Sequence, residues 1–135
     1  MKPEAKRAFT NSLFDEFARI GKAVGSGRRL ELIELLAQGE RMVEELANET
    51  AQTVANTSQH LQVLRQAHLV ETRRSGTHIA YRLADDRVAR LWCALRDVGQ
   101  ARLAEVDRLV DTYLKDRGEK TFIDCQRSLD PRIER

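Results

Sequence analysis

The sequence has 135 residues and a formal net charge of +2; 33% of the residues are charged and 5% are aromatic. This length fits one compact domain, and the composition favours a helical protein over a β-sandwich or barrel. No run of about 18 apolar residues and no charged-then-apolar leader is present, so we expect a cytoplasmic protein without a membrane span. Two cysteines, Cys93 and Cys125, are too few for a disulfide scaffold in a chain of this size.

Apolar residues at spacings of three and four predict three helices in the first 50 residues. The first begins near Lys6 and ends near Val24, where Gly25-Ser26-Gly27 forms a turn and caps the next helix. This turn lacks the Gly-Lys-Ser/Thr of a phosphate-binding loop. The second helix ends at Gln38-Gly39, and a shorter third helix covers about 42–48.

A fourth helix is predicted from Val54 to about Ala67, with Thr53 as its N-cap. The face expected to point into the core carries Val54, Thr57, Leu61 and Leu64. The opposite arc and its flanks carry Ala55, Asn56, Ser58, Gln59, His60, Gln62 and Val63. Amide and hydroxyl groups pair with base edges and phosphates in a major groove, although this helix taken alone favours ordinary polar surface.

The periodicity changes to two in residues 69–73 and 78–83, and Ser75-Gly76 lies between these segments. This pattern predicts a β-hairpin with Arg73 and Arg74 near its tip. Residues 51–83 hold four arginines, one glutamate and all three histidines, which suits contact with phosphates, although a solvated charged face would look the same. Helix, turn, helix and basic hairpin is the order of a winged helix-turn-helix domain.

After Asp85 the helical spacing returns for about 30 residues, with an apolar stripe from Val88 to Tyr113. One helix of that length would measure about 45 Å, more than a domain of this size can cover. We therefore expect a homodimer that pairs this helix and the first one; a helix folded back on its own domain is the alternative. The predicted organisation is a DNA-binding and dimerisation domain over 1–116, then a charged, flexible tail over 117–135.

Four segments resemble the ArsR/SmtB family of small dimeric repressors, over residues 14 to about 115. They read KAVGSGRRLELIELLAQGE, VEELANET, TSQHLQVLRQAHLV and RRSGTHIAYRL. The resemblance implies a mainly α winged helix-turn-helix homodimer with a β-hairpin wing, which binds a palindromic operator in double-stranded DNA and leaves it on a chemical signal. By position it implies DNA contacts at Thr53, Asn56, Thr57, Ser58, Gln59, His60, Gln62, Arg73, Arg74 and His78.

The sequence departs from the family's pattern at several positions. Where the family commonly ends its recognition helix with a left-handed glycine this chain has His68, a residue that tolerates that conformation at some cost. Met42 and Glu44 replace the family's Cys-x-Cys metal ligands. The second metal site of the family uses Asp and His, whereas the matching stretch here offers Asp85, Arg87, Val98 and Ala101. We therefore predict neither a metal site nor a cofactor.

Cys93 and Cys125 are the remaining candidates for sensing a chemical signal. Cys93 lies off the apolar stripe, so we expect it to be accessible, and Arg90 and Arg96 would favour its thiolate. The two thiols could form a disulfide or polysulfide bridge, or hold trivalent arsenic or antimony; two inert cysteines are the alternative. Reactive sulfur is slightly favoured, because the chain resembles the regulator half of family members that carry a sulfurtransferase (rhodanese) domain.

Two other classes of protein compete with the repressor interpretation. An enzyme is disfavoured, because the sequence has no His-Glu-x-x-His, Gly-x-Ser-x-Gly or dinucleotide-binding motif. An interaction module that keeps the dimer without specific DNA reading remains open, and the lack of a preferred palindrome in a footprint would support it.

Overall fold

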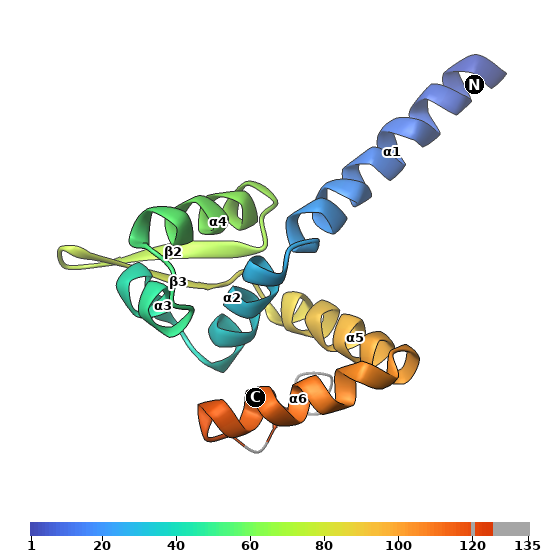
Figure 1. Cartoon of the computed structure of the whole chain (residues 1–135). Helices are drawn as coiled ribbons and strands as arrows, with labels where there is room; N and C mark the ends of the chain where they lie inside the picture. The colour runs from blue at the N-terminus through green and yellow to red at the C-terminus, as the bar shows by residue number, and fades with distance from the viewer. Residues whose placement is uncertain (120, 126–135) are drawn as a thin grey trace.

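The computed structural model describes residues 1–119 and 121–125. Its elements are α1 (Pro3–Val24), α2 (Gly27–Gln38), β1 (Arg41–Met42), α3 (Val43–Glu49), α4 (Val54–Gln66), β2 (Val70–Ser75), β3 (His78–Leu83), α5 (Asp86–Arg102) and α6 (Ala104–Arg117). Helices α2, α3 and α4 gather beside a small sheet, and α1 projects away from this body (Figure 1). The predicted class, mainly α with a β-hairpin wing, is confirmed.

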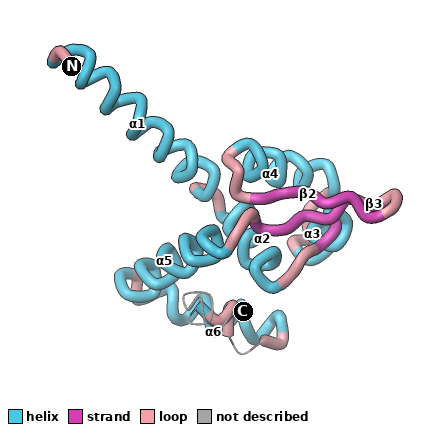
Figure 2. The backbone as a smooth tube through the Cα atoms, turned by 180° about the vertical axis from the view of Figure 1, so that it is seen from behind, coloured by secondary structure: helices cyan, strands magenta, loops and turns pink. Residues whose placement is uncertain are grey.

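The sheet is antiparallel with the strand order β1-β3-β2, and the β2–β3 hairpin reaches out from the helices (Figure 2). Its register pairs Thr72 with Tyr81 and Arg74 with Ile79. Gly76 occupies the turn with a φ of 65°, a conformation that glycine adopts without strain. Strand β1 was not predicted, because two residues carry no periodic signal.

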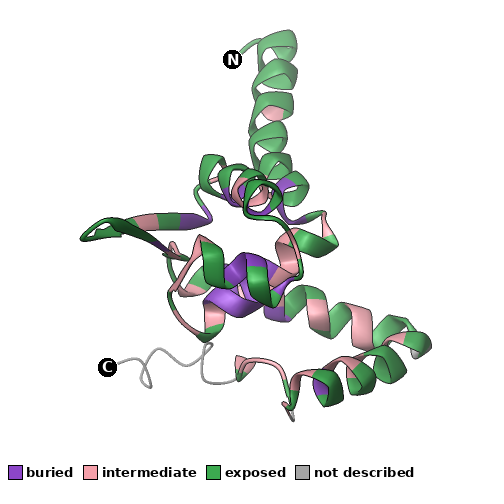
Figure 3. Cartoon of the chain, turned by 60° about the vertical axis from the view of Figure 1, so that its left-hand side comes forward, coloured by how far each residue is buried: buried purple, intermediate pink, exposed green. Residues whose placement is uncertain are grey.

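Aliphatic side chains of α2, α3 and α4 form the core, and the buried residues concentrate on these helices (Figure 3). Six of them are at most 2% exposed: Leu32, Ile33, Leu35, Leu46, Leu61 and Leu64. Leu61 and Leu64 thus fasten α4 to the core as predicted. Val54 does not, because its side chain is 46% exposed. As the first residue of α4 it lies at the end of the helix, beyond the packed face.

The end of α4 is a Schellman motif centred on His68. The His68 N–H donates to the Arg65 carbonyl and the Leu69 N–H to the Leu64 carbonyl, both at 2.9 Å. His68 has a φ of 63°, so the predicted left-handed histidine is confirmed. This cap reverses the chain and sends it directly into β2.

The predicted single helix after Asp85 is wrong, because the chain breaks at Leu103 into α5 and α6. Leu103 has an extended backbone, with φ −118° and ψ 102°. Helix α6 then runs back beneath α5 (Figure 1), and Leu114 becomes buried at 8% exposure. Because α6 folds back, one chain buries apolar side chains that a single helix of about 45 Å would have exposed. This is the alternative given above, a helix folded back on its own domain. The part of α5 and α6 that stays exposed includes Leu95, Val98 and Leu109.

The described part of the segment after α6 packs on the domain, and the flexibility predicted for the tail stays a prediction. The Phe122 ring stacks on Tyr113 at 5.5 Å between centroids and meets the Trp92 ring edge-on at 6.0 Å. These aromatic contacts explain why the Phe122-Ile123 pair interrupts a charged sequence. Residue 120 and residues 126–135 of the predicted tail lie outside the described residues.

Candidate DNA-binding surface

Helix α4 begins at a capped turn that orients its first residues. The Thr53 hydroxyl oxygen accepts a hydrogen bond from the Asn56 N–H at 3.0 Å, which confirms Thr53 as the N-cap. The Thr53 backbone is extended, so the chain enters α4 at a sharp angle. This geometry leaves the first two turns of α4 on the outside of the molecule, next to β2 (Figure 1).

Four polar side chains on this outer side are available for a ligand. Asn56, Gln59 and Gln62 are exposed, and Ser58 is half-buried. Within the described residues, none of the four side chains makes a hydrogen bond to another part of the chain. Their donors and acceptors are therefore satisfied by water, which base edges and phosphates can replace.

Thr57 belongs to the core, and its predicted contact with DNA is corrected. Its side chain is 1% exposed, and its hydroxyl donates to the Thr53 carbonyl at 2.9 Å. The family position suggested a contact, whereas the helical face had placed the same residue inside. The prediction from the helical face is confirmed, because the 100° spacing aligns Thr57 with Leu61 and Leu64.

His60 connects α4 to the junction of α1 and α2. The Arg29 guanidinium lies 3.4 Å from His60 Nδ1, and it also donates to the carbonyl oxygens of Lys22 at 3.0 Å and Ala23 at 2.5 Å. Arg29 thus caps the C-terminal end of α1 while it touches α4. His60 is half-buried by this contact, and its role toward DNA stays a prediction.

The wing carries the three predicted residues Arg73, Arg74 and His78 on exposed positions. Arg73 is engaged by Glu40 from the loop before β1, with Nε–Oε1 at 2.9 Å and Nη2–Oε2 at 2.6 Å. The Arg73 guanidinium lowers the pKa of the Glu40 carboxyl, chiefly through this hydrogen bond. The ion pair is therefore complete at neutral pH and is lost when the pH falls through the lowered pKa of Glu40.

Glu40→Gln is expected to strengthen DNA binding at low salt by several-fold, because it frees Arg73 to contact a phosphate. One additional phosphate contact should steepen the plot of log affinity against log salt by about 0.9. Operator titrations at several salt concentrations measure both effects. The control is Glu105→Gln on α6, which removes a carboxylate from another exposed ion pair, the one between Glu105 and Arg108. An unchanged slope in Glu40→Gln would show that Arg73 does not reach the DNA.

Arg65 is a candidate contact that the sequence interpretation did not place. It lies on the last turn of α4 and shares a cavity of about 230 Å³ with Thr72, Arg74, Ile79 and Tyr81. Arg65 and Arg74 make no ion pair within the described residues, so two free guanidinium groups flank the space between α4 and the wing. Such a pair suits a DNA phosphate. The signal was present as the charge excess of residues 51–83, but only the fold brings the two arginines together.

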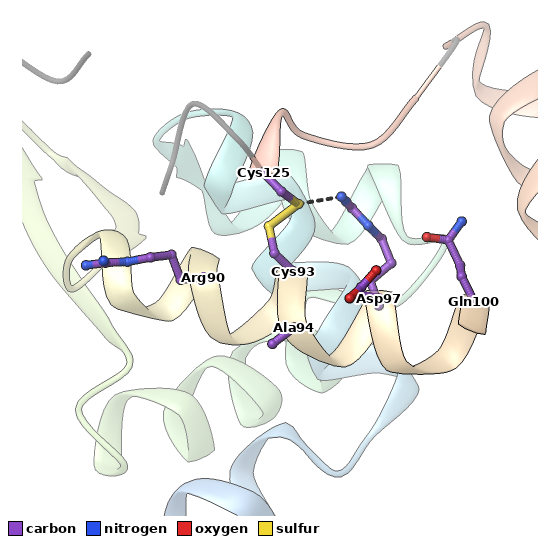
Figure 4. Close-up of a pocket in the computed structure, with 7 residues that line it drawn as sticks. Arg90, Cys93, Ala94, Asp97, Gln100 and Cys125 are labelled. Carbon is purple, nitrogen blue, oxygen red and sulfur yellow. Dashed lines mark hydrogen bonds between the residues drawn. A yellow bond between two sulfur atoms is a disulfide. The ribbon is translucent and has the colours of Figure 1, made fainter. Parts of the chain in front are cut away.

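Cys93 and Cys125 form a disulfide with a Cα–Cα distance of 5.8 Å, across 32 residues of sequence. The predicted accessibility of Cys93 is wrong, because this residue is 6% exposed. Cys93 is buried because the segment that contains Cys125 covers the side of α5 opposite the apolar stripe. Arg96 Nη2 donates to Cys125 Sγ, which is the partner sulfur and not the Cys93 sulfur that the sequence pattern had suggested (Figure 4).

Arg96 also reaches a buried carboxylate, Glu34 on α2, which the sequence interpretation missed. Glu34 is 2% exposed, and it accepts hydrogen bonds from Trp92 Nε1 at 2.8 Å and Gln38 Nε2 at 2.7 Å. Arg96 Nη1 lies 3.8 Å from the same carboxylate. Burial lowers the pKa of Arg96, and the Glu34 and Asp97 carboxylates oppose that shift. A glutamate inside the apolar run Leu32-Ile33-Glu34-Leu35-Leu36 was the available signal.

In residues 1–119 and 121–125, no group of three or more His, Cys, Asp or Glu side chains lies close enough to hold a metal ion. No helix in the same part of the chain is both long and apolar enough to cross a membrane.

Comparison with known proteins identifies the fold that carries this surface. Residues 26–72, from the N-cap of α2 into β2, match the family model for "Bacterial regulatory protein, arsR family". The NMR structure of the homodimeric winged helix-turn-helix DNA-binding domain of Mb0332 from Mycobacterium bovis is 45% identical. It has a TM-score of 0.65 and covers 69% of this chain and 86% of that one. The fold is therefore that of a winged helix-turn-helix protein, with α4 in the place of the second helix of the motif.

Full-length relatives give the family. The biofilm growth-associated repressor of Agrobacterium fabrum is 45% identical over 80 residues, which cover 59% of this chain and 68% of the relative. The chain belongs to the ArsR family of bacterial regulatory proteins, as the sequence segments predicted. The HTH-type transcriptional regulator Rv0324 of Mycobacterium tuberculosis is 46% identical over 95 residues, which cover 70% of this chain. The chain spans about half the length of Rv0324 and KmtR, two of the relatives it matches (42% and 54%).

Proposed function

We propose that this chain is a dimeric repressor that binds a palindromic operator through α4 and the wing. The observation that carries this proposal is the exposed row of Asn56, Gln59 and Gln62, which has no partner within the described residues, together with the free arginines Arg65 and Arg74 between α4 and the wing. Amides read base edges and guanidinium groups neutralise phosphates, so the two parts supply sequence reading and affinity respectively. Relatives named as repressors include those of Agrobacterium fabrum and Xylella fastidiosa.

The exposed apolar face of α1 supports the dimer. Phe9, Phe14 and Phe17 are 58%, 63% and 64% exposed, and Leu13 is 41% exposed. An apolar row on a helix that projects from the body is costly in water unless a second surface covers it. Leu95 and Val98 on α5 are further exposed apolar residues that a partner could cover. The Mb0332 domain, which is similar over 69% of this chain, is described as homodimeric.

The oxidation state of Cys93 and Cys125 is the proposed signal for release. Hydrogen peroxide that oxidises the two thiols gives the disulfide and two molecules of water. The disulfide fastens the Phe122 segment over Arg96 and Trp92, and both of these side chains contact Glu34 on α2. Because α2 packs against α4 in the core, this contact gives the sulfur pair a physical route to the DNA-binding helix. We infer that the dithiol form binds the operator and that the disulfide form releases it.

Operator affinity should therefore fall on oxidation by roughly 5- to 150-fold, the range of an ordinary coupling free energy. An operator selected from random DNA is titrated with reduced protein and with protein treated with hydrogen peroxide, an organic polysulfide or arsenite. Cys93→Ser and Cys125→Ser should bind like the reduced wild type under all treatments. Release by none of the reagents, or undiminished release in both variants, would remove the thiol hypothesis. Release by arsenite alone would favour an arsenical-responsive repressor, and failure to select a palindrome would favour an interaction module.

A further inference from the structure

A cavity of about 350 Å³ lies on the outer side of α5, next to the disulfide. Its lining consists of Arg90, Cys93, Ala94, Arg96, Asp97, Gln100 and Cys125. The volume is within the range of sites that hold small organic molecules. Neither the family match, which ends at residue 72, nor the proposed DNA contacts assign a role to this cavity.

The lining follows one face of α5, because Arg90, Cys93, Asp97 and Gln100 are three or four residues apart. The distance along the helix from Arg90 to Gln100 is about 15 Å. The disulfide lies at the centre, with Arg90 at one end and Gln100 at the other (Figure 4). Leu95 and Val98 point about 140–160° away from Cys93 around the helix, so a dimer formed through them leaves the cavity open.

The charges of the cavity favour an anion. Arg90 and Arg96 outnumber Asp97, the one carboxylate in the lining. Arg96 Nη1 already lies 3.8 Å from the Glu34 carboxylate. Arg90 Nε has no hydrogen-bond partner within the described residues. The Arg90 guanidinium is therefore the cation of the lining that remains available for a charge-assisted hydrogen bond to a ligand carboxylate.

We propose that this cavity binds an anionic low-molecular-weight thiol, which reduces the Cys93–Cys125 disulfide and so reverses the release signal. The reversal rests on the proposed redox control of operator binding, whereas the binding and the exchange reaction do not. An anion attracted by Arg90 brings its thiolate near the sulfur pair, which raises the local concentration of the nucleophile.

The exchange proceeds in two displacements. The first thiolate attacks Cys125 Sγ, because Cys125 is half-buried and Cys93 is 6% exposed. The S–S bond breaks, Cys93 leaves as a thiolate, and Cys125 carries a mixed disulfide. A second thiolate then attacks the outer sulfur of this adduct, which releases the low-molecular-weight disulfide and leaves Cys125 as a thiolate. Two electrons pass from the two small thiolates to the two protein sulfurs, and water supplies protons to the resulting thiolates.

The test compares three small thiols on the oxidised full chain: mercaptosuccinate (anionic), thioglycerol (neutral) and cysteamine (cationic). Aliquots are quenched with iodoacetamide, and intact-protein mass spectrometry follows the loss of the disulfide. After correction for the thiolate fraction of each reagent, mercaptosuccinate should react at least about tenfold faster than thioglycerol at low salt. Its rate should saturate with concentration, as binding before reaction requires. A mercaptosuccinate adduct should appear on Cys125.

Arg90→Gln should remove most of the preference for mercaptosuccinate, and Arg90→Lys should retain it. Arg102→Gln removes an exposed arginine of α5 that does not line the cavity, and should leave the preference intact. Equal corrected rates for the three thiols, or an unchanged preference in Arg90→Gln, would overturn the proposed site. The operator titration tests the release signal separately from the cavity. A preference for mercaptosuccinate without any redox effect on DNA binding would contradict the proposed release signal and would leave the cavity assignment unchanged.

Discussion

Gln59→Ala is expected to lower operator affinity by roughly 5- to 150-fold, the equivalent of about 1–3 kcal/mol for one good amide–base pair. Gln59 is exposed in the second turn of α4, the part of a recognition helix that meets base edges. An alanine keeps the helix and removes only the amide. The affinity is measured by fluorescence anisotropy on the selected operator, and the loss should be confined to operators that retain the preferred base pair.

Gln66→Ala is the matched control, because it removes the same amide from an exposed position of the same helix. Gln66 is seven residues further along, about 10 Å from Gln59 along the axis, near the C-terminal end of α4. Its substitution should change operator affinity by less than about twofold. Equal losses in the two variants would mean that α4 does not present its first turns to the bases.

Leu64→Ala is expected to lower the free energy of unfolding by about 2–5 kcal/mol. The Leu64 side chain is 0% exposed, and it joins α4 to the core formed by α2 and α3. Removing it leaves a cavity beneath the recognition helix and loses the transfer free energy of the deleted methyl groups. Urea unfolding followed by circular dichroism, at one protein concentration because of the dimer, gives the difference in stability.

Val63→Ala provides the control for this measurement. Val63 is the preceding residue of α4 and is 37% exposed, so its substitution should change the stability by less than about 1 kcal/mol. If Leu64→Ala were as mild as Val63→Ala, α4 would not be held by the packing described above.

The sequence predicts the DNA-binding half well, because its signals are local. Thr53 caps α4 from its own side chain, and His68 takes the left-handed position in the cap at the end of α4. Gly76 takes the left-handed position in the turn of the wing, directly after Ser75, which ends β2. Each of these features is decided within about five residues of the chain. The same local rule fails at Thr57, where family position and helical face disagreed and burial followed the helical face.

The C-terminal half was less predictable, because its structure depends on contacts between distant residues. The apolar stripe is interrupted near Gly99 and Arg102 but resumes at Val106 with the same spacing, so periodicity alone indicates one helix. The disulfide closes 32 residues, and the Arg73–Glu40 pair spans 33. Residue spacing carries no information across such separations, since the fold-back of α6 and the position of β1 must be known first.

The most direct test of α4 and the wing as the DNA interface is a salt titration of operator affinity. Wild-type protein is compared with the double variant Gln59→Ala and Arg74→Ala, with both proteins reduced. We predict at least a tenfold loss of affinity at each salt concentration. The slope of log affinity against log salt should also become shallower by about one for each phosphate that Arg74 no longer neutralises. Unchanged affinity together with an unchanged slope would contradict the assignment of this surface to DNA.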